Sequence, residues 1–452
     1  MTEPASRPRR ITRVELTRVV APTPDQWRDL AWWLVLIAAG LALTAWAVRS
    51  GAMLGTASAP FLGAYRLQLA PTSLLAPAVA VAVLAAAAAG WFERARWGLV
   101  LASSYLAGLA WSLSLAVVDG AAGLTRSLSN PDNYLSDLNA IGDAPLRYLR
   151  HFTQDAAVHS VAARGHPPGP ALLLWALERV GLHRVGLALF ITAVGTLTIP
   201  LVLAAVRGVC GETPARRYAT VLILAPYAIW VAVSEDVFTS VLGAAMVAAG
   251  VRASDRQRGG PRAGAWALAA GLLLGLASLF SYAAPWLGLS VVFLYFARRR
   301  PFLNIATGVG ALLPILLADR LGFGWLEGLG TAHHDYLVRI EPYRSVWWWS
   351  AISLVALLLA AGPALLASAR KLRNTPGWPF LVGAACAVLF SVLAGLARGG
   401  VEHAWLAFFP WLTIAAVAPN RQAGPDVPVP ALLAAFGALT AIIVEAVLAT
   451  PW

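Results

Sequence analysis

Residues 31–48 read AWWLVLIAAGLALTAWAV, an apolar run without a charged side chain, and runs of this kind recur along the chain. A membrane-spanning helix needs about 20 mainly apolar residues. Of the 452 residues, 59% are hydrophobic and 12% are charged, whereas about 25% are charged in an average soluble domain. One soluble core could not bury that much apolar surface. The sequence therefore predicts an all-α polytopic membrane protein and excludes soluble and disordered classes.

Thirteen segments are apolar enough to be predicted spans, although several are short and their edges are approximate. The predicted spans are residues 31–48, 73–91, 97–118, 186–206, 217–233, 236–252, 264–281, 284–296, 302–318, 349–368, 378–396, 403–418 and 430–449. The run at 31–48 lacks a small-residue cleavage site followed by a soluble domain, so it is interpreted as a true first span and not as a signal peptide.

The distribution of charge gives the topology. With the N-terminus in the cytoplasm, 22 of the 34 basic residues fall in inner segments, while 13 of the 22 acidic residues fall in outer segments. This is the positive-inside bias of a multi-pass plasma-membrane protein. A shift of one span would invert every later loop. The net charge of +12 is therefore assigned to topology, and no nucleic-acid partner is expected.

The same pattern divides the chain into parts. Residues 1–30 form a basic cytoplasmic tail, 31–418 a transmembrane catalytic domain, 419–429 a Gly/Pro-rich cytoplasmic linker and 430–452 the last span. Two outer loops, 119–185 and 319–348, are longer than a helix connection requires.

The first long loop contains Asp119, Asp137, Arg164 and His166. Its middle part is predicted to form short amphipathic helices that lie in the membrane interface. It is either a solvated loop anchored by apolar residues or a catalytic platform, in which a carboxylate acts as a general base and arginines hold a phosphate. His166-Pro167-Pro168-Gly169 precedes a short apolar helix over 170–181, because proline suits a helix start.

Two later turns carry acids on the same predicted side. Ser234-Glu235-Asp236 lies between two predicted spans. Turn chemistry alone explains the Ser and Asp there; alternatively, the two adjacent acids bind substrate hydroxyls or a cation. The last outer turn contains Glu402 and His403. Charged groups that lead into a span are costly unless they face a cavity.

The second long loop contains His333-His334-Asp335-Tyr336, Tyr343-Arg344 and Trp347-Trp348-Trp349. The spacing does not match a known metal motif, so no metal is expected. The tryptophans are typical of an interfacial belt. Tyr336, Tyr343 and Arg344 suit a lipid phosphate at headgroup level.

Ionisable groups from distant parts of the chain are thus predicted to lie on one side of the membrane. This convergence is stronger evidence for a functional site than any single motif. The chain has no P-loop, dinucleotide fingerprint or nucleophile elbow, and no cofactor is expected. Cys210 and Cys386 show no metal spacing and are expected to be structural.

This combination resembles the GT-C superfamily of membrane glycosyltransferases. The His166-Pro167-Pro168 segment is similar to one in the protein-mannosyltransferase-like branch, and the chain looks like actinobacterial GT-C-like proteins over residues 97–418. The matching stretches are Tyr134-Leu135-Ser136-Asp137, His166-Pro167-Pro168-Gly169, Ala225-Pro226 with Trp230, Ser234-x-Asp236, Ser281-Tyr282, Gly324-Trp325-x-x-Gly328 and Glu402-x-x-Trp405. The chain departs at His403, where arginine is expected, and at Glu341; two spans, not one, precede the first long loop.

The resemblance implies inverting transfer of a sugar, with mannose or arabinose most plausible, from a polyprenyl-phosphate donor to a hydroxyl outside the cytoplasm. The acceptor is a glycan, lipid, protein or natural product. The implied roles are a base at Asp137, with Asp119 second, and donor contacts by His166, Arg164 and Arg344.

Asp236, Glu235, Glu402 and His403 are supporting candidates. The alternatives are a transporter or flippase of a lipid-linked sugar or other amphiphile, and an inactive scaffold. A transporter is expected to carry ionisable groups near the membrane midplane, where Glu445 is the one clear acid.

Overall fold

A computed structural model describes residues 21–257, 259–419 and 429–449. The described chain is almost entirely helical; its one strand pair joins β1 (Ala64–Tyr65) antiparallel to β2 (Leu448–Ala449). The prediction of an all-α protein with several apolar helices is confirmed. Most of the predicted basic tail and linker, and the last three residues, lie outside the described residues.

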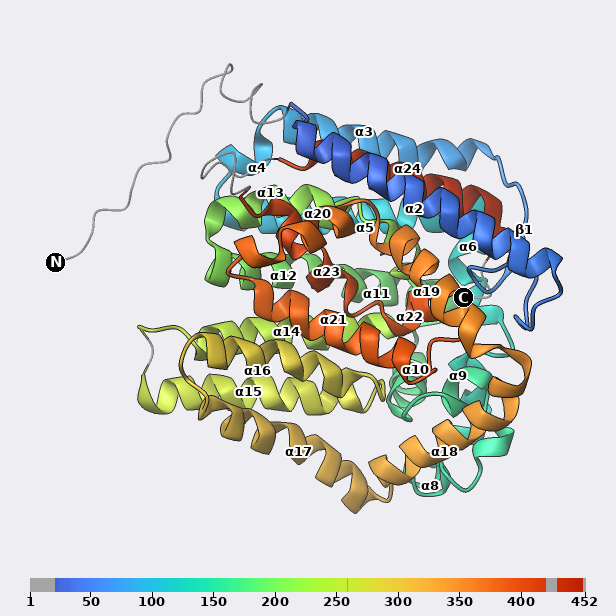
Figure 1. Cartoon of the computed structure of the whole chain (residues 1–452). Helices are drawn as coiled ribbons and strands as arrows, with labels where there is room; N and C mark the ends of the chain where they lie inside the picture. Colours follow the sequence, from blue (N-terminus) through green and yellow to red (C-terminus); the bar gives the residue numbers. More distant parts are fainter. Residues whose placement is uncertain (1–20, 258, 420–428, 450–452) are drawn as a thin grey trace.

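The helices run roughly side by side between two ends of the molecule (Figure 1). The long helices of the bundle are α5 (Trp97–Ala116), α11 (Arg184–Thr196), α12 (Thr198–Cys210), α13 (Glu212–Ile223), α14 (Asp236–Ala253), α15 (Gly260–Ser278), α16 (Gly288–Ala297), α17 (Leu303–Leu321), α19 (Val346–Ala361) and α21 (Trp378–Leu393). Close backbone approach holds part of it together. A Cβ on Gly271 of α15 would lie 2.0 Å from the carbonyl oxygen of Thr307 in α17. Small residues at membrane helix contacts permit such packing.

Three further helices lie along one side of the bundle: α2 (Pro24–Arg49), α3 (Leu75–Ala88) and α24 (Ala431–Val447), near the top of Figure 1. Helix α2 begins seven residues before the predicted edge at residue 31. The Thr23 side chain accepts a hydrogen bond from the Gln26 amide, and Pro24 occupies the first turn, so the polar residues before Ala31 start the helix.

Within the described residues, six helices are long and apolar enough to cross a membrane, and a seventh span results if the bent pair around α18 (Trp325–Arg339) and α19 counts as one. Three predicted spans are broken. Residues 403–418 form α22 (Val401–Ala404), α23 (Phe409–Leu412) and a 3₁₀ turn, 217–233 is divided after α13, and 349–368 is divided at Gly362 between α19 and α20 (Ala364–Arg370). Pro226, Pro363 and Pro410, which lack an N–H, lie in these broken segments. The count of thirteen is not confirmed.

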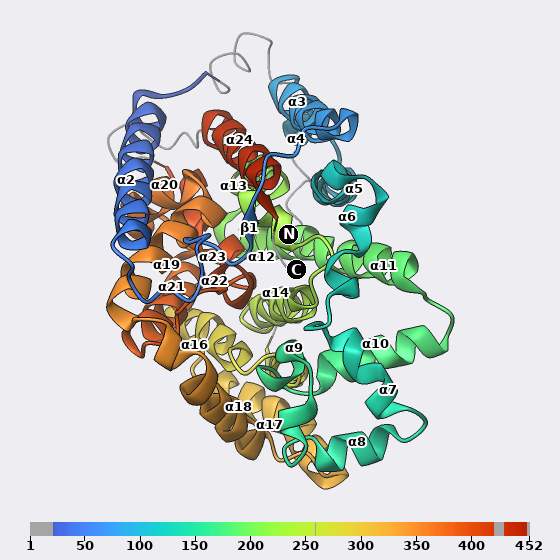
Figure 2. The ribbon, with the colours of Figure 1, turned by 90° about the vertical axis from the view of Figure 1, so that its right-hand side faces the viewer.

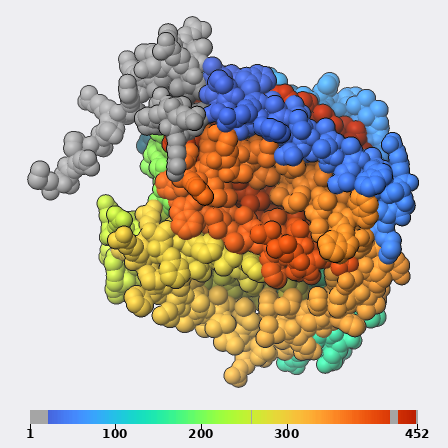
Figure 3. Space-filling model, viewed as in Figure 1, coloured from blue at the N-terminus to red at the C-terminus, as the bar shows by residue number. Residues whose placement is uncertain are grey.

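Apolar side chains remain exposed on the outer helices. Val35 and Trp46 of α2 are 56% and 61% exposed, and Leu312 and Leu316 of α17 are both 54% exposed. The space-filling view shows α2 along its upper edge and the α16–α17 region below (Figure 3). Surfaces of this kind suit lipid, which agrees with a multi-pass membrane protein.

The contacts separate the two ends. Arg370 pairs with Asp29 at 2.7 Å at one end, whereas Thr153 donates to Glu327 at 2.9 Å at the other. The second end, called here the long-loop end, holds both long loops and faces the viewer in Figure 2. Its short helices are α6 (Ala121–Thr125), α7 (Leu138–Ile141), α8 (Pro145–His151), α9 (Val161–Arg164) and α10 (Gly169–Arg179). The predicted short helices therefore exist, and α10 begins as expected with Pro170 in its first turn.

Candidate active site

The centre of the site is Asp236, the first residue of α14. Its Oδ2 lies 3.3 Å from Nδ1 of His403 in α22, and its Oδ1 lies 3.8 Å from Nε2 of His166, which precedes α10. The Ser234 hydroxyl lies 3.4 Å from Asp236 Oδ2 and 3.3 Å from His403 Nδ1. Three segments far apart in the chain thus surround one carboxylate. The sequence predicted that His166, Asp236 and His403 share one side of the membrane, and the structure brings their side chains together.

The turn before Asp236 is held in an unusual conformation. Val233 has φ of +59°, a value that is rare for a β-branched residue. Its amide donates to the Thr192 hydroxyl at 3.2 Å, and its carbonyl accepts from the Ser127 hydroxyl at 3.1 Å. Two distant side chains therefore fix the turn that presents Ser234 and Asp236, and strain of this kind is typical of functional sites.

Glu235 connects this turn to the first long loop. Its Oε1 accepts a hydrogen bond from Asn133 Nδ2 at 3.1 Å, and the side chain is buried. Burial raises the pKa of Glu235 to about 7, although the Asn133 bond opposes the rise. The next residue, Tyr134, places its ring edge-on to His166 with centroids 6.0 Å apart.

Glu402 is fully buried beside His403, and no side chain among the described residues donates a hydrogen bond to its carboxylate. Burial raises its pKa, while nearby His403, the backbone amides of Glu402 and Leu62, and Arg344 oppose the rise. The ring of Trp230 approaches His403, with centroids 6.5 Å apart. A buried carboxyl is costly unless it is well hydrogen-bonded, so Glu402 is well placed to receive a polar group of a bound molecule or water.

Asp137 has a different environment. It is 3% exposed, and its oxygens accept from the Ser160 amide at 3.2 Å and the Ser160 hydroxyl at 2.5 Å. His159 Nδ1 lies 3.2 Å from Asp137 Oδ1, while His159 Nε2 lies 3.1 Å from the Phe152 carbonyl. The carboxylate therefore joins two parts of the first long loop.

Asp119 follows α5 and forms ion pairs with Arg66 and Arg126, whose Nη2 atoms both approach Asp119 Oδ2. Arg66 comes from the connection between α2 and α3. Arg126 lies one residue before Ser127, which bonds to the Val233 turn. Ser127 thus connects the segment that carries Arg126 to the turn that precedes Asp236.

The predicted donor contacts are divided between two places. Arg164 approaches Asp335 of α18 at 3.6 Å and donates to the His159 carbonyl at 3.3 Å, whereas His166 lies beside Asp236. The pair His333-His334 is exposed, and the described residues contain no group of three His, Cys, Asp or Glu side chains that could hold a metal.

Arg344 and Tyr336 bind the loop before α22. Tyr336 donates to the Gly395 carbonyl at 2.7 Å, and Arg344 donates to the Arg398 carbonyl at 2.7 Å. Arg398 returns a bond to the Arg344 carbonyl at 3.0 Å and pairs with Glu341 at 2.9 Å. Glu341, a departure from the family pattern, therefore neutralises Arg398. Tyr343 is 65% exposed, as a headgroup contact requires.

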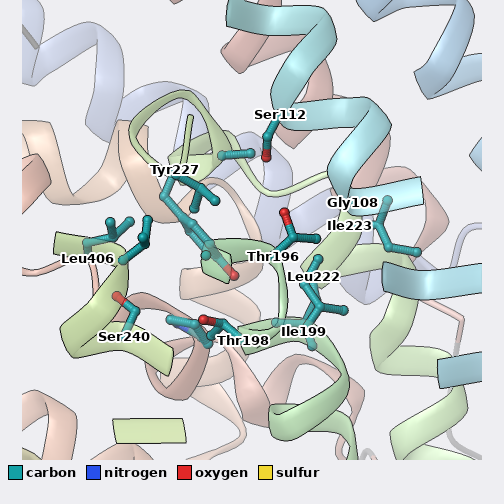
Figure 4. Close-up of a pocket in the computed structure, with 15 residues that line it drawn as sticks. Gly108, Ser112, Thr196, Thr198, Ile199, Leu222, Ile223, Tyr227, Ser240 and Leu406 are labelled. Carbon is teal, nitrogen blue, oxygen red and sulfur yellow. The ribbon is translucent and has the colours of Figure 1, made fainter. Parts of the chain in front are cut away.

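An apolar pocket lies among α5, α11, α12, α13 and α14 (Figure 4). Val237 and Leu406, which line it, follow Asp236 and His403 by one and three residues. Tyr227 reaches across the pocket, and none of the lining side chains is charged. The pocket thus borders the first turn of α14, which begins at Asp236.

The sequence analysis assigned no site role to Asn133, His159, Ser160 or Arg66, and it named Trp230 only as part of a matching stretch. Asn133 adjoins the Tyr134–Asp137 stretch, and His159 lies in the first long loop with His166. Nothing in the sequence pairs Arg66 with Asp119, which lies 53 positions further on, beyond α3, α4 (Trp91–Arg94) and α5.

Comparison with known proteins gives few matches. No family model and no curated protein matches the chain. Solved structures that resemble it include ArnT from Cupriavidus metallidurans in the apo state, with 18% identity, a TM-score of 0.41 and coverage of 60% of this chain and 53% of ArnT. ArnT from the same organism bound to undecaprenyl phosphate has 16% identity and a TM-score of 0.42, with coverage of 63% of this chain and 58% of ArnT. The Archaeoglobus fulgidus oligosaccharyltransferase has 17% identity and a TM-score of 0.39, with coverage of 56% of this chain and 40% of the oligosaccharyltransferase. The chain thus spans about half the length of the ArnT structures that it matches.

Proposed function

We propose that this protein is a GT-C-type membrane glycosyltransferase that transfers a sugar from a polyprenyl-phosphate donor to an acceptor hydroxyl. The observation that carries the proposal is the convergence of His166, Asp236 and His403 from three distant segments at the long-loop end. The proposed location of this end is outside the cytoplasm, and the positive-inside charge bias of the sequence supports it. Mannose or arabinose is the proposed sugar, and a glycan, lipid, protein or natural product the proposed acceptor.

The proposed reaction is a single displacement. The acceptor hydroxyl oxygen forms a bond to the anomeric carbon while the bond from that carbon to the phosphate oxygen breaks. The hydroxyl proton moves to a carboxylate, and the electron pair of the broken bond leaves with the polyprenyl phosphate. Because attack and departure occur on opposite faces, the configuration inverts. The carboxylate must come within hydrogen-bond reach of the hydroxyl.

Asp236 is the carboxylate that we favour as base. Its side chain is 22% exposed, and its nearest ionisable neighbours are two histidines. Asp137, the first sequence candidate, is 3% exposed and already accepts hydrogen bonds on both oxygens. Asp119, the second candidate, is paired with two arginines. Asp236 Oδ2 also has partners in Ser234 and His403. Its Oδ1, however, lies 3.8 Å from its nearest partner, His166, which is beyond hydrogen-bond range. This oxygen can accept a substrate proton without losing a hydrogen bond.

The test is transfer by purified full-length protein in nanodiscs, supplied with a panel of radiolabelled polyprenyl-phosphate sugars and a generic acceptor mixture. We expect one donor to be consumed by wild type, and Asp236→Asn to abolish consumption while the protein remains folded. Asp143→Asn, an exposed carboxylate at the same end, serves as the matched control. If donors bind but none is consumed, and the protein flips donor across the membrane of proteoliposomes, the transferase proposal is wrong and the transporter alternative is supported.

A further inference from the structure

The long-loop end holds a second cluster of charge that the reaction above leaves without a role. It consists of Arg66, Asp119, Arg126 and Glu445, and is called here the arginine pair cluster. Arg66 and Arg126 direct one Nη2 atom each at the same oxygen, Asp119 Oδ2. Glu445 of α24 acts on both guanidinium groups at longer range.

The pairing leaves polar atoms unsatisfied. Asp119 Oδ1 and Arg66 Nε are buried without a hydrogen-bond partner among the described residues. A guanidinium has five donors in a fixed fork that matches two oxygens at once, yet here two forks meet on one oxygen. The pairing therefore leaves one buried donor of Arg66 and one buried oxygen of Asp119 unsatisfied.

The two arginines also oppose each other. Burial lowers the pKa of Arg126, the charge of Arg66 lowers it further, and Glu445 offsets part of the effect. Their side chains are 35% and 36% exposed, whereas that of Asp119 is 7% exposed. A ligand can consequently reach the guanidinium groups from outside, while the carboxylate stays behind them.

We propose that Arg66 and Arg126 form a binding site for a phosphate group, and that Asp119 occupies this site as an internal anion when no phosphate is bound. A phosphate offers at least two oxygens to the two forks, so each arginine gains a partner of its own. The inference rests on the proposed function for its natural ligand, the phosphate of a polyprenyl-phosphate sugar. Ser127, adjacent to Arg126, donates to the carbonyl of Val233, in the turn that precedes Asp236, so the two charged clusters are connected through the first long loop.

This site includes a residue outside the stretch 97–418 in which the chain resembles GT-C proteins. Arg66 lies in the connection between α2 and α3, and its amide donates to the carbonyl of Val447, the last residue of α24, at 2.9 Å. The end of α24 therefore holds Arg66 in the site. Arg164 and Arg344, the predicted phosphate contacts, instead donate to backbone carbonyls.

The test measures binding without turnover, by equilibrium binding of farnesyl phosphate to full-length protein in detergent. Arg66→Gln and Arg126→Gln should each weaken binding by about tenfold, the value of a lost hydrogen bond to a charged group. Arg179→Gln, an arginine at the same end that pairs with Asp143, should bind as wild type. Three further ligands separate the contributions to binding: farnesol tests the prenyl chain, inorganic phosphate tests free phosphate, and dioleoyl phosphatidate tests an ordinary lipid headgroup. We expect farnesyl phosphate to bind most tightly. Binding of farnesol should be the same in wild type and in both arginine variants.

Asp119→Asn supplies the decisive arm. An internal anion competes with the ligand, so its removal should tighten farnesyl phosphate binding by about three- to tenfold, whereas a purely structural ion pair gives no tightening. Arg66→Lys, which keeps the pair with Asp119 but loses the fork, covers the case in which Arg66→Gln does not fold. Unchanged binding in both arginine variants, or weaker binding in Asp119→Asn, would overturn the site. Because no sugar is transferred, this failure is separate from failure of the transferase.

Discussion

Asp137 and Asp236 lie at the same end of the molecule, and each has a histidine nitrogen within about the same distance, 3.2 Å and 3.3 Å. Their other partners differ. Asp137 is bound by Ser160 from its own loop, and both members of the Asp137–His159 pair are 3% exposed. Asp236 lies between histidines of two other segments, and its side chain is 22% exposed. The same two residue types therefore hold a loop together in one place and leave an accessible carboxylate in the other.

The largest expected effect tests the accessible carboxylate. Asp236→Asn should lower the rate of sugar transfer by roughly 10²–10⁴-fold, the range of a lost general base, because the amide cannot accept the proton. Transfer assays on wild type, Asp236→Asn and the control Asp143→Asn measure this. Retention of more than half the wild-type rate by Asp236→Asn would return the base to Asp137 or Asp119.

Asp137→Ala should act on stability. It leaves the Ser160 amide and His159 without their acceptor inside the loop, which costs about 3 kcal/mol for a broken buried pair. Thermal unfolding and limited proteolysis of the first long loop measure the loss, with Asp132→Ala as an exposed control in the same loop. A variant that keeps wild-type stability but loses all transfer would instead support Asp137 as the base.

Glu235, next to Asp236, should make the stability of the folded protein depend on pH. Its pKa in the fold is about 7 against 4.5 for the free side chain, so the folded protein holds the proton more tightly. Its contribution to stability is thus complete below about pH 4.5 and is lost as the pH rises through 7, by about 3 kcal/mol at most. Unfolding of wild type at pH 5 and pH 8 should show this fall, and Glu235→Gln should reduce it. An equal fall in both proteins would assign the dependence to the neighbouring histidines.

The smallest expected effect compares the two histidines of Asp236. His166 lies 3.8 Å from the carboxylate and His403 lies 3.3 Å from it. We expect His166→Gln to lower transfer by less than about tenfold and His403→Gln to lower it more, because only the nearer histidine is within hydrogen-bond range. The ratio of the two rates is the measurement, and a reversed order would place the substrate nearer to His166.

The candidate site was partly predictable. Composition and charge selected both long loops and the two acidic turns, and His166, Asp236 and His403 do meet in space. The role of each carboxylate was not predictable, because it depends on the partners that burial leaves to it. Arg66 reaches Asp119 across 53 residues, a pairing that no local pattern encodes.

The sequence by itself determined that the chain is a bundle of apolar helices, since its hydrophobic runs leave no other way to satisfy the backbone in lipid. It also determined which segments group at each end, because loop charge follows the topology. Only the tertiary structure decided that three predicted spans are broken, that Asp137 is enclosed and that Asp236 is accessible. Such outcomes depend on hydrogen bonds and burial between residues distant in the chain, and these exist only once the helices have packed.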